Sequence, residues 1–275
     1  MKFKYDFFVC RKHISFTFLT QMISCPQCAL LGRILRVPAP YKPSKARDIG
    51  TLTHTVLERA MVKAKETKKI PSPDEYLKII SQIREEQPEK EFLPPMSDEK
   101  LAKGLQEYHD ETFGHRLSEP IQVEFELPKS ELWTFRAKGR VDLQISKDVI
   151  DYKTKAKSTG KKLESSKRMT KLQGCFYNKA LEEGGIDIES FEAHNLIITS
   201  KAVTPQIYKY TKKELIEAEQ ELKDMIDNAV KVMDSGRFVR NYMDMFCPCE
   251  YEEYCKDENK TEAFIKSLNI PKSIY

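Results

Sequence analysis

The chain of 275 residues has no apolar run long enough to span a bilayer. Its first stretch, MKFKYDFFVCRKH, starts with positive charge but reaches Arg11, Lys12 and His13 too soon for a signal peptide. Internal repeats are absent, and so is a large excess of one charge sign: 46 Lys and Arg face 42 Asp and Glu, a net charge of +4. We therefore expect a cytoplasmic protein with no membrane partner. The mild basic excess permits a nucleic-acid partner without demanding one.

What the chain does contain is typical of a folded protein with a heavily charged surface, at 40% hydrophobic and 32% charged residues. Its length suits one large domain or two small ones. Seven cysteines in a cytosolic chain favour metal ligands or free thiols over disulfides.

The hydrophobic spacing predicts helices in the first 118 residues. One helix should open after Ser15, a plausible N-cap, and run through residues 16–37. A Pro-rich connector follows, and residues 49–66 make a second amphipathic helix. Its buried stripe should consist of Leu52, Val56, Leu57 and Ala60.

The spacing then changes to that of strands, over 121–128, 133–146 and 148–154, with a turn at 146–148. A helix over 165–185, two strands within 191–210 and a long helix over 211–236 complete the order. The long helix should begin with a capping box of Thr211 and Glu214. This order predicts an α/β fold.

The stretch DVIDYKTKAK, residues 148–157, places Asp151 and Lys153 on one side of a strand, because successive side chains alternate. The turn at 146–148 would pair this strand with the preceding one, so that Asp142 falls nearly opposite residues 151 and 152. Two neighbouring carboxylates repel each other unless a cation lies between them. Mg²⁺ or Mn²⁺ suits carboxylate and carbonyl oxygens, and Lys153 could then position a water or stabilise charge on a phosphate.

The competing interpretation is a surface hairpin whose acids are merely solvated. It is disfavoured because Val141, Leu143, Val149 and Ile150 are expected to be buried beside these charges.

The segment GRVDLQISKDVIDYKTK resembles the core of the PD-(D/E)XK nuclease superfamily. The segment GTLTHTVLERA is similar to the helix that carries a histidine metal ligand in the RecB-like branch, here His54, and KLQGCFYNKAL resembles that branch's Gln-x-x-x-Tyr helix, here Gln173 and Tyr177. In VEFELP, Glu124 or Glu126 stands where the family carries an acid on its first core strand. The resemblance implies a restriction-endonuclease-like core, a mixed central sheet flanked by helices.

The resemblance also implies roles. His54, Asp142, Asp151 and the carbonyl of Tyr152 would hold Mg²⁺ or Mn²⁺, with Glu124 or Glu126 nearby. Asp142, Asp151 and Lys153 would act in catalysis, and Gln173 and Tyr177, four residues apart on one helix face, would orient DNA.

Five of the cysteines fall into two groups, SCPQC and CPCEYEEYC. A subset of RecB-like nucleases binds a [4Fe-4S] cluster with one cysteine before the core and three after it. By position the ligands would be Cys25, Cys247, Cys249 and Cys255, with Cys28 as a substitute, although the C-x-C spacing departs from the family's C-x-x-C. Structural Zn²⁺ remains an alternative.

A basic stretch follows the Asp-x-Lys strand, interrupted by a single acid, Glu164. Such a run is usually a solvated loop. Here it leaves the expected metal site directly, so we expect it to bind DNA phosphates. Its members are Lys155, Lys157, Lys161, Lys162, Lys167, Arg168 and Lys171.

Taken together, the sequence predicts a single RecB-like nuclease domain over residues 1–275. It would have a mainly helical segment at 1–118, a catalytic core at 119–210 and a helical, Cys-rich segment at 211–275. The resemblance implies a Mg²⁺- or Mn²⁺-dependent exonuclease on single-stranded DNA or DNA ends, in recombination, repair or CRISPR adaptation. The chain lacks a Walker phosphate loop, so a helicase would be a separate partner. Alternatives are a catalytically silent DNA- or recombination-partner-binding protein and a sequence-specific endonuclease.

Overall fold

The computed structural model describes residues 13–34, 45–90, 92–128, 131–132, 135–154, 160–236, 238 and 251. The described residues group into two compact units. The larger one contains residues from 43–128 and 140–218, and the smaller one contains those from 1–42, 129–139 and 219–275. The single domain predicted over 1–275, with internal divisions at 118 and 210, stays a prediction.

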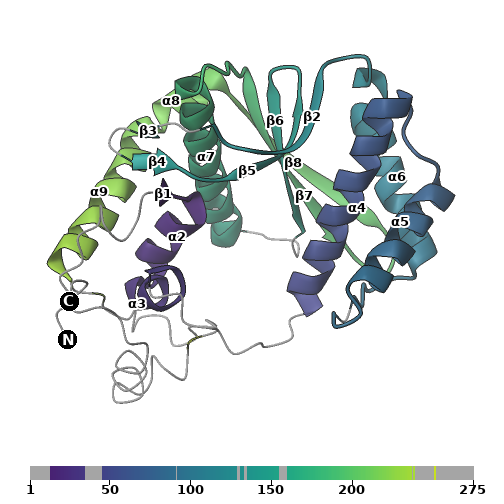
Figure 1. The fold of residues 1–275 in the computed structure, drawn as a ribbon, viewed down its shortest axis with the longest axis horizontal. Coiled ribbons are helices and arrows are strands. Elements are labelled where there is room, and N and C mark those ends of the chain that lie inside the picture. The colour runs from purple at the N-terminus through teal and green to yellow at the C-terminus, as the bar shows by residue number, and fades with distance from the viewer. Residues whose placement is uncertain are drawn as a thin grey trace. The chain divides into compact units, whose positions relative to one another are not determined.

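The larger unit is built around a five-stranded sheet, whose strands are labelled in Figure 1. Its order is β2, β5, β6, β7, β8. The pair β6–β7 is parallel and the other neighbours are antiparallel, so the predicted mixed sheet is confirmed. The strands are β2 (Ile121–Glu126), β5 (Arg140–Ile145), β6 (Asp148–Thr154), β7 (Ser190–Ile198) and β8 (Val203–Thr211).

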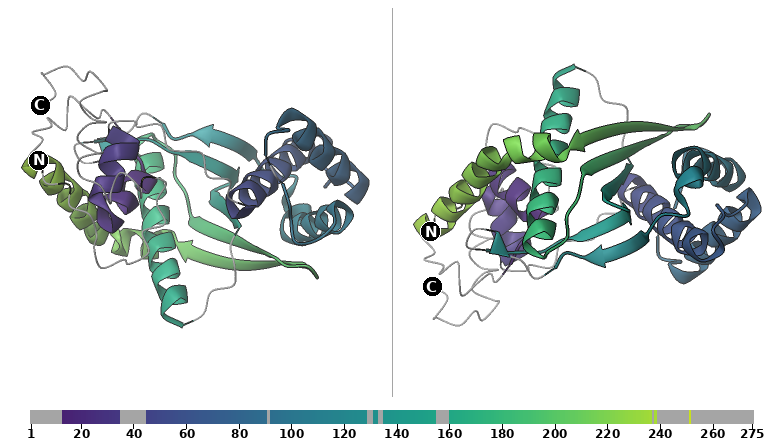
Figure 2. Two further views of the ribbon diagram at one scale, coloured as in Figure 1. Left: turned by 90° about the horizontal axis from the view of Figure 1, so that it is seen from below. Right: turned by 90° about the horizontal axis from the view of Figure 1, so that it is seen from above.

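Helices cover both faces of this sheet, as the two views of Figure 2 show. One face carries α4 (Lys45–Thr67), α5 (Pro73–Glu86) and α6 (Asp98–Phe113), followed by η2 (Gly114–Arg116). The other carries α7 (Gly160–Glu183) and α8 (Lys212–Glu217). Because side chains alternate along a strand, Ile150 and Tyr152 enter the core of α4–α6, whereas Asp151 and Lys153 point to the face of α7.

The amphipathic helix predicted over 49–66 is α4, and its predicted stripe is confirmed. Leu52, Val56, Leu57 and Ala60 are each 0% exposed. Burial of this stripe fixes the rotation of α4 about its axis. His54 therefore lies beside the stripe and remains partly exposed.

Close approach between α7 and the sheet depends on Gly174. A Cβ at this position would lie 2.5 Å from Cδ1 of the buried Phe191 on β7. The helix ends before Gly184, and Gly185 has a φ of +79°, so the predicted termination at two glycines is confirmed.

The smaller unit contains the short strands β1 (His13–Ile14), β3 (Glu131–Leu132) and β4 (Phe135–Ala137), paired in the order β1, β4, β3. The N-cap Ser15 is confirmed, since its side chain accepts the N–H of Phe18. The continuous helix predicted over 16–37 is wrong: the backbone is extended at Cys25, and Pro26 starts a new helix there. The helical elements are α2 (Phe16–Ser24), α3 (Pro26–Ala29), η1 (Leu30–Ile34) and α9 (Glu219–Ser235).

The long helix predicted over 211–236 is divided at Ala218 into α8 and α9. Its predicted capping box is confirmed, with Thr211 and Glu214 each bonding the other's main-chain N–H. Across the described ranges, none of the helices combines the length and apolarity needed to cross a bilayer.

Candidate active site

The candidate site lies in the larger unit, where β5 and β6 separate. Their ladder pairs Ile145 with Asp148 and ends at Leu143 and Ile150. Beyond it, the main-chain N–H of Tyr152 donates a 2.7 Å hydrogen bond to Oδ2 of Asp142. A carboxylate thus takes the place of a strand carbonyl. The predicted position of Asp142 opposite residues 151 and 152 is confirmed.

Asp151 and Lys153 lie where β6 still pairs with β7, a pairing that continues to Thr154. Nζ of Lys153 is 2.6 Å from Oδ2 of Asp151. Gln173 on α7 donates to Oδ1 of Asp151 over 2.9 Å. The Asp151 carboxylate is buried, and its Oδ2 accepts no regular hydrogen bond. The ion pair with Lys153 therefore offsets most of the cost of burying this oxygen.

His54 reaches the same place from α4. Its Nδ1 lies 3.7 Å from Oδ2 of Asp142, and it hydrogen-bonds the main chain of Tyr152. Burial lowers the pKa of His54 below 6.5 and outweighs the opposing effect of the Asp151 charge. The imidazole is therefore neutral near pH 7, the form in which histidine binds metals.

The two carboxylates of the site cannot both be charged at low cost. Burial, followed by the charge of Asp151, raises the pKa of Asp142 to about 8. The hydrogen bond from Tyr152 and the charge of Lys153 oppose this rise without overcoming it. A divalent cation would favour the charged form of both acids.

Among the residues that the structure describes, no three His, Cys, Asp or Glu side chains form a group ready to hold a metal ion. The two carboxylates have hydrogen-bond and ion-pair partners within the protein: Asp142 accepts the N–H of Tyr152, and Asp151 contacts Lys153 and Gln173. The donor chemistry nevertheless suits a hard divalent cation, with two carboxylates, a carbonyl and a neutral imidazole close together.

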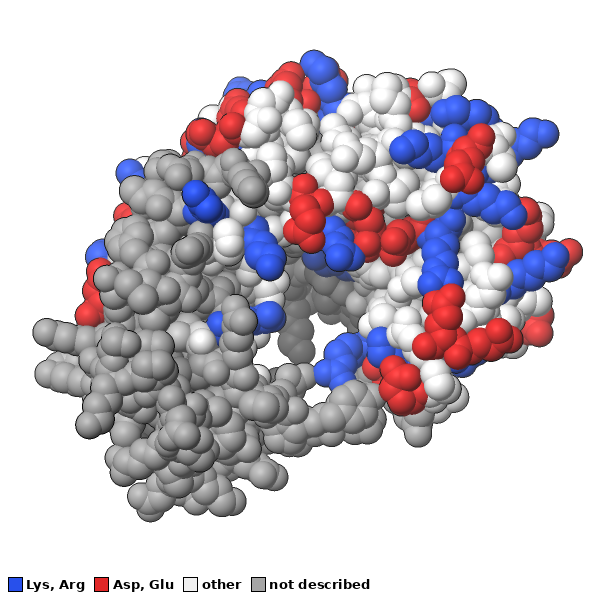
Figure 3. All heavy atoms as spheres, viewed as in Figure 1, with Lys and Arg blue, Asp and Glu red and all other residues white. Residues whose placement is uncertain are grey.

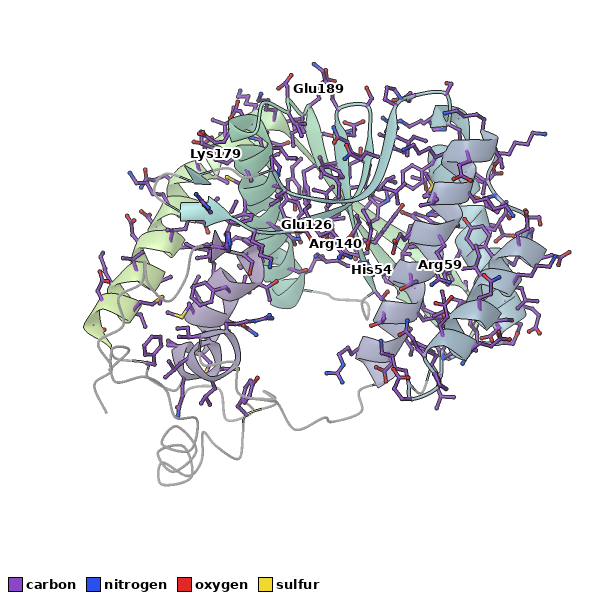
Figure 4. All side chains as sticks on the ribbon, viewed as in Figure 1. His54, Arg59, Glu126, Arg140, Lys179 and Glu189 are labelled. Atoms are coloured by element: carbon purple, nitrogen blue, oxygen red, sulfur yellow. The ribbon has the colours of Figure 1, made fainter. Side chains whose placement is uncertain are left out.

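Two glutamates were candidates on the first strand, and the structure distinguishes them. The charge of Glu124 acts on both His54 and Asp142, whereas Glu126 is 64% exposed. Arg140 joins the two, with NH1 2.7 Å from Oε2 of Glu124 and Nε 3.7 Å from Oε1 of Glu126. Figure 4 shows Glu126, Arg140 and His54 close together along the lower side of the sheet.

Glu124 also has an unusual backbone, with φ of +38° in a strand. Non-glycine residues in this region carry a strain of about 1–3 kcal/mol. The pairing of β2 with β5 continues on either side, at Val123 and Phe125. Within β2, the positive φ thus falls on the residue whose charge acts on His54 and Asp142.

Sequence reasoning missed Glu58, which hydrogen-bonds Glu124. Burial, then the charge of Glu124, raises the pKa of Glu58 above 4.5. A sequence signal did exist, because Glu58 is four residues after His54 and so shares its helix face. Arg140 was also missed.

Gln173 and Tyr177 do share one helix face, as predicted, and their side chains are 3.3 Å apart at Nε2 and OH. Both have partners inside the protein. Tyr177 donates to the carbonyl of Arg140 over 3.1 Å, while Gln173 contacts Asp151. These bonds connect α7 to β5 and β6, and a contact with DNA stays a prediction.

The basic stretch is described only partially. Lys155 and Lys157, and the side chains of Lys161 and Lys162, lie outside the described residues. On α7, Lys167 lies 3.1 Å from Glu164 and above the ring of Tyr208, and Lys171 lies 3.9 Å from Glu217. Arg168 is exposed. Figure 3 shows Lys and Arg interspersed with Asp and Glu on the face in view.

The predicted cluster ligands are also described only partially. Cys25 and Cys28 are buried in the smaller unit, Cys25 between α2 and α3 and Cys28 within α3. Cys247, Cys249 and Cys255 lie outside the described residues, so the ligand set stays a prediction.

Comparisons with known proteins agree with this geometry. The family profile of the PD-(D/E)XK nuclease superfamily matches residues 13–256, and the chain belongs to that superfamily. A crystal structure of a candidate exonuclease from Eubacterium rectale aligns with a TM-score of 0.57 and 14% identity over 90% of each chain. This likeness shows the fold, and the predicted restriction-endonuclease-like core is confirmed.

A second solved structure, SSO0001, aligns with a TM-score of 0.39 and 16% identity, over 89% of this chain and 86% of that one. That score is too low to support an argument. A search of curated protein sequences found no match.

Proposed function

We propose that this member of the superfamily is an active, Mg²⁺- or Mn²⁺-dependent DNA nuclease of the RecB-like branch. The observation that carries the proposal is the convergence of Asp142, Asp151, Lys153 and His54 where β5 and β6 separate. Hydrolysis would add the oxygen of water to phosphorus and release the sugar oxygen with a proton.

The metal would be held by His54, Asp142, Asp151 and the carbonyl of Tyr152. A bound Mg²⁺ or Mn²⁺ supplies Lewis-acid polarisation of the phosphate and lowers the pKa of water. The raised pKa of Asp142 supports this assignment, because burial and then the charge of Asp151 disfavour its charged form, and a bound cation would offset both effects.

Lys153 would position the attacking water or stabilise charge on the phosphate. In the structure its amino group is 2.6 Å from Oδ2 of Asp151. That ion pair would hold the lysine at the proposed metal site before substrate arrives. Glu124 would complete the acid set, and Glu126 is the weaker candidate because of its exposure.

DNA would reach the site along α7. Gln173 and Tyr177 line its inner face, and the basic stretch that contains Lys167, Arg168 and Lys171 would contact phosphates. These contacts carry no sequence information, which favours ends or single strands over a specific duplex site. The similarity to a candidate exonuclease agrees with exonuclease action.

The cysteines would form a second metal site. We propose a [4Fe-4S] cluster on Cys25, Cys247, Cys249 and Cys255, with Cys28 as the substitute ligand and Zn²⁺ as the alternative. The burial of Cys25 and Cys28 supports a structural role. Iron, sulfide and zinc analysis of anaerobically purified protein would separate the two metals, and absence of all three would refute the site.

Any helicase that acts with this nuclease would be a separate protein, because the chain has no Walker phosphate loop. A recombination or CRISPR protein is the other partner that we propose.

The deciding experiment is cleavage of end-labelled single- and double-stranded DNA with Mg²⁺ or Mn²⁺. Asp151→Ala and Lys153→Ala should each abolish cutting, and Lys147→Ala, an exposed lysine on the β5–β6 turn, should not. The fragment ladder would show end preference and polarity. DNA binding without cutting, in the presence of either metal, would instead identify a catalytically silent DNA-binding protein.

A further inference from the structure

Behind Asp151 and Lys153, on the opposite face of the sheet, lies a set of buried aromatic and polar side chains. We call it the tyrosine–histidine cluster. No member is more than 3% exposed. Its members are Tyr76, Tyr108, His109, Tyr152 and His194.

Two hydrogen-bonded arms make up the cluster. In the first, the hydroxyl of Tyr152 lies 3.4 Å from Nε2 of His109, whose Nδ1 lies 2.5 Å from the hydroxyl of Tyr76. In the second, the hydroxyl of Tyr108 lies 2.5 Å from Nδ1 of His194.

The second arm continues to solvent through an acid and a lysine. Nε2 of His194 lies 2.9 Å from Glu192, and Lys209 donates to the other oxygen of Glu192 over 2.7 Å. Burial alone would raise the pKa of Glu192, but the bonds from His194 and Lys209 lower it to about 2.

The rings of the cluster surround Tyr152. The ring centroids of His109, His194 and Tyr108 lie 6.0, 6.3 and 6.4 Å from that of Tyr152. A fourth ring, that of His54, meets Tyr152 edge-on at 6.2 Å. Tyr152 therefore joins the cluster to a candidate metal ligand.

The main chain of Tyr152, as well as its ring, contacts residues of the candidate metal site. Its N–H bonds Asp142, and His54 hydrogen-bonds the same main chain. Because the ring and the peptide belong to one residue, fixing the ring also fixes the peptide. A buried, fully bonded polar network holds one geometry more strictly than apolar packing does.

We propose that the tyrosine–histidine cluster positions the metal site from behind, with His109 holding Tyr152 and Tyr152 holding both Asp142 and His54. His109 and Tyr76 are then positioning residues, not catalytic ones. The inference rests on the proposed function only in assuming that this site binds a divalent cation. Partners that orient metal ligands commonly change metal affinity by about 10–100-fold when removed.

The test is a titration of the full chain with Mn²⁺ in the absence of DNA. Binding is measured from the electron paramagnetic resonance signal of the Mn²⁺ that remains free. His109→Phe keeps a ring of similar size but loses both nitrogen contacts. We expect its Mn²⁺ dissociation constant to rise by about tenfold or more. His109→Gln, which can still hydrogen-bond the hydroxyl of Tyr152, should recover some of that loss.

Loss of stability alone must be separated from loss of positioning. Ile83→Val shortens a fully buried side chain of α5 in the same core without removing a polar contact. It should lower the melting temperature and leave Mn²⁺ binding unchanged. If His109→Phe fails to fold, Tyr152→Phe, which removes only the hydroxyl, should show the same shift.

Two results would overturn the proposal: Mn²⁺ affinity in His109→Phe or Tyr152→Phe equal to that of the wild type, or an equal loss in Ile83→Val. The proposed function fails separately, if the wild type binds Mn²⁺ and DNA without cutting. A wild type that binds no Mn²⁺ would overturn the positioning role as well.

Discussion

The main-chain N–H of Tyr152 donates to Oδ2 of Asp142 over 2.7 Å, at the point where two strands stop pairing. The bond satisfies a backbone donor that the ladder no longer serves. It also ties the acid of β5 to the strand that carries Asp151. The candidate site therefore forms at the point where β5 separates from β6.

Asp142→Asn should keep this hydrogen bond, because an amide oxygen can accept the same N–H. It removes the charge that a divalent cation needs. We expect a folded protein whose Mg²⁺- or Mn²⁺-dependent DNA cleavage falls by at least about 100-fold. Cleavage rates on end-labelled DNA, with circular dichroism as the check on folding, would measure this.

The matched variant is Asp187→Asn, an exposed acid paired with Lys147 and Lys212. It should cleave like the wild type. Retention of full activity by Asp142→Asn would remove Asp142 from the metal site.

Gln173→Ala removes the 2.9 Å hydrogen bond to Oδ1 of Asp151. A hydrogen bond to a charged group contributes about 1.5–3 kcal/mol, so we expect at least about a tenfold lower rate. Gln173→Glu should be worse, because it adds a like charge beside Asp151. Single-turnover cleavage at saturating DNA would isolate this effect from binding.

Tyr177→Phe provides the comparison, since it loses the bonds to the carbonyl of Arg140 and to Gln173 but leaves the bond from Gln173 to Asp151 in place. We expect a smaller reduction than for Gln173→Ala. The reverse order would show that α7 acts on the site mainly through Tyr177.

Gly174→Ala should destabilise the protein even though alanine favours a helix. The new Cβ would lie 2.5 Å from Cδ1 of Phe191 and 2.9 Å from Cδ2 of Leu215, both fully buried. Overpacking of this kind costs about 1–3 kcal/mol, more than the gain in helix propensity. Thermal melting should show the loss, together with slower cleavage because Gln173 moves with α7.

Gly50→Ala on α4 is the control, because a Cβ there would have open space around it. It should raise stability by about 0.5–1 kcal/mol. Equal melting temperatures for the two variants would contradict the close approach of α7 to the sheet.

The stability of the metal-free protein should fall at acid pH because of His109. Burial, and then His194, lowers the pKa of His109 from 6.5 to about 3. Between these values the unfolded chain binds a proton that the folded one excludes, so stability is full above about pH 6.5 and declines as pH falls toward 3. The slope is at most about 1.4 kcal/mol per pH unit.

Urea unfolding in EDTA at several pH values would measure that slope. His109→Phe should flatten it, whereas His115→Phe, at an exposed histidine, should not. An unchanged slope in His109→Phe would show that other groups cause the acid loss.

Local chemistry in the sequence determined much of this protein. The 3.6-residue spacing of Leu52, Val56 and Ala60 fixed α4 and its buried face, and the alternation along residues 148–154 put Asp151 and Lys153 on one side of a strand. The turn at 146–148 then brought Asp142 opposite them. These features depend on neighbours within about fifteen residues, which a pattern can report.

Other features depend on contacts that no local pattern encodes. Pro26 and the extended Cys25 divide the first helix, where hydrophobic spacing alone predicted continuity. Glu58 meets Glu124 only because α4 packs against β2, and His109 meets Tyr152 across 43 residues. The strand predicted over 133–146 is likewise divided, into β4 and β5, which belong to different sheets. The sequence by itself thus determined most strands of the five-stranded sheet, the acids and the lysine. The tertiary structure decided what holds them, because burial and long-range hydrogen bonds arise only when the sheet and its helices assemble.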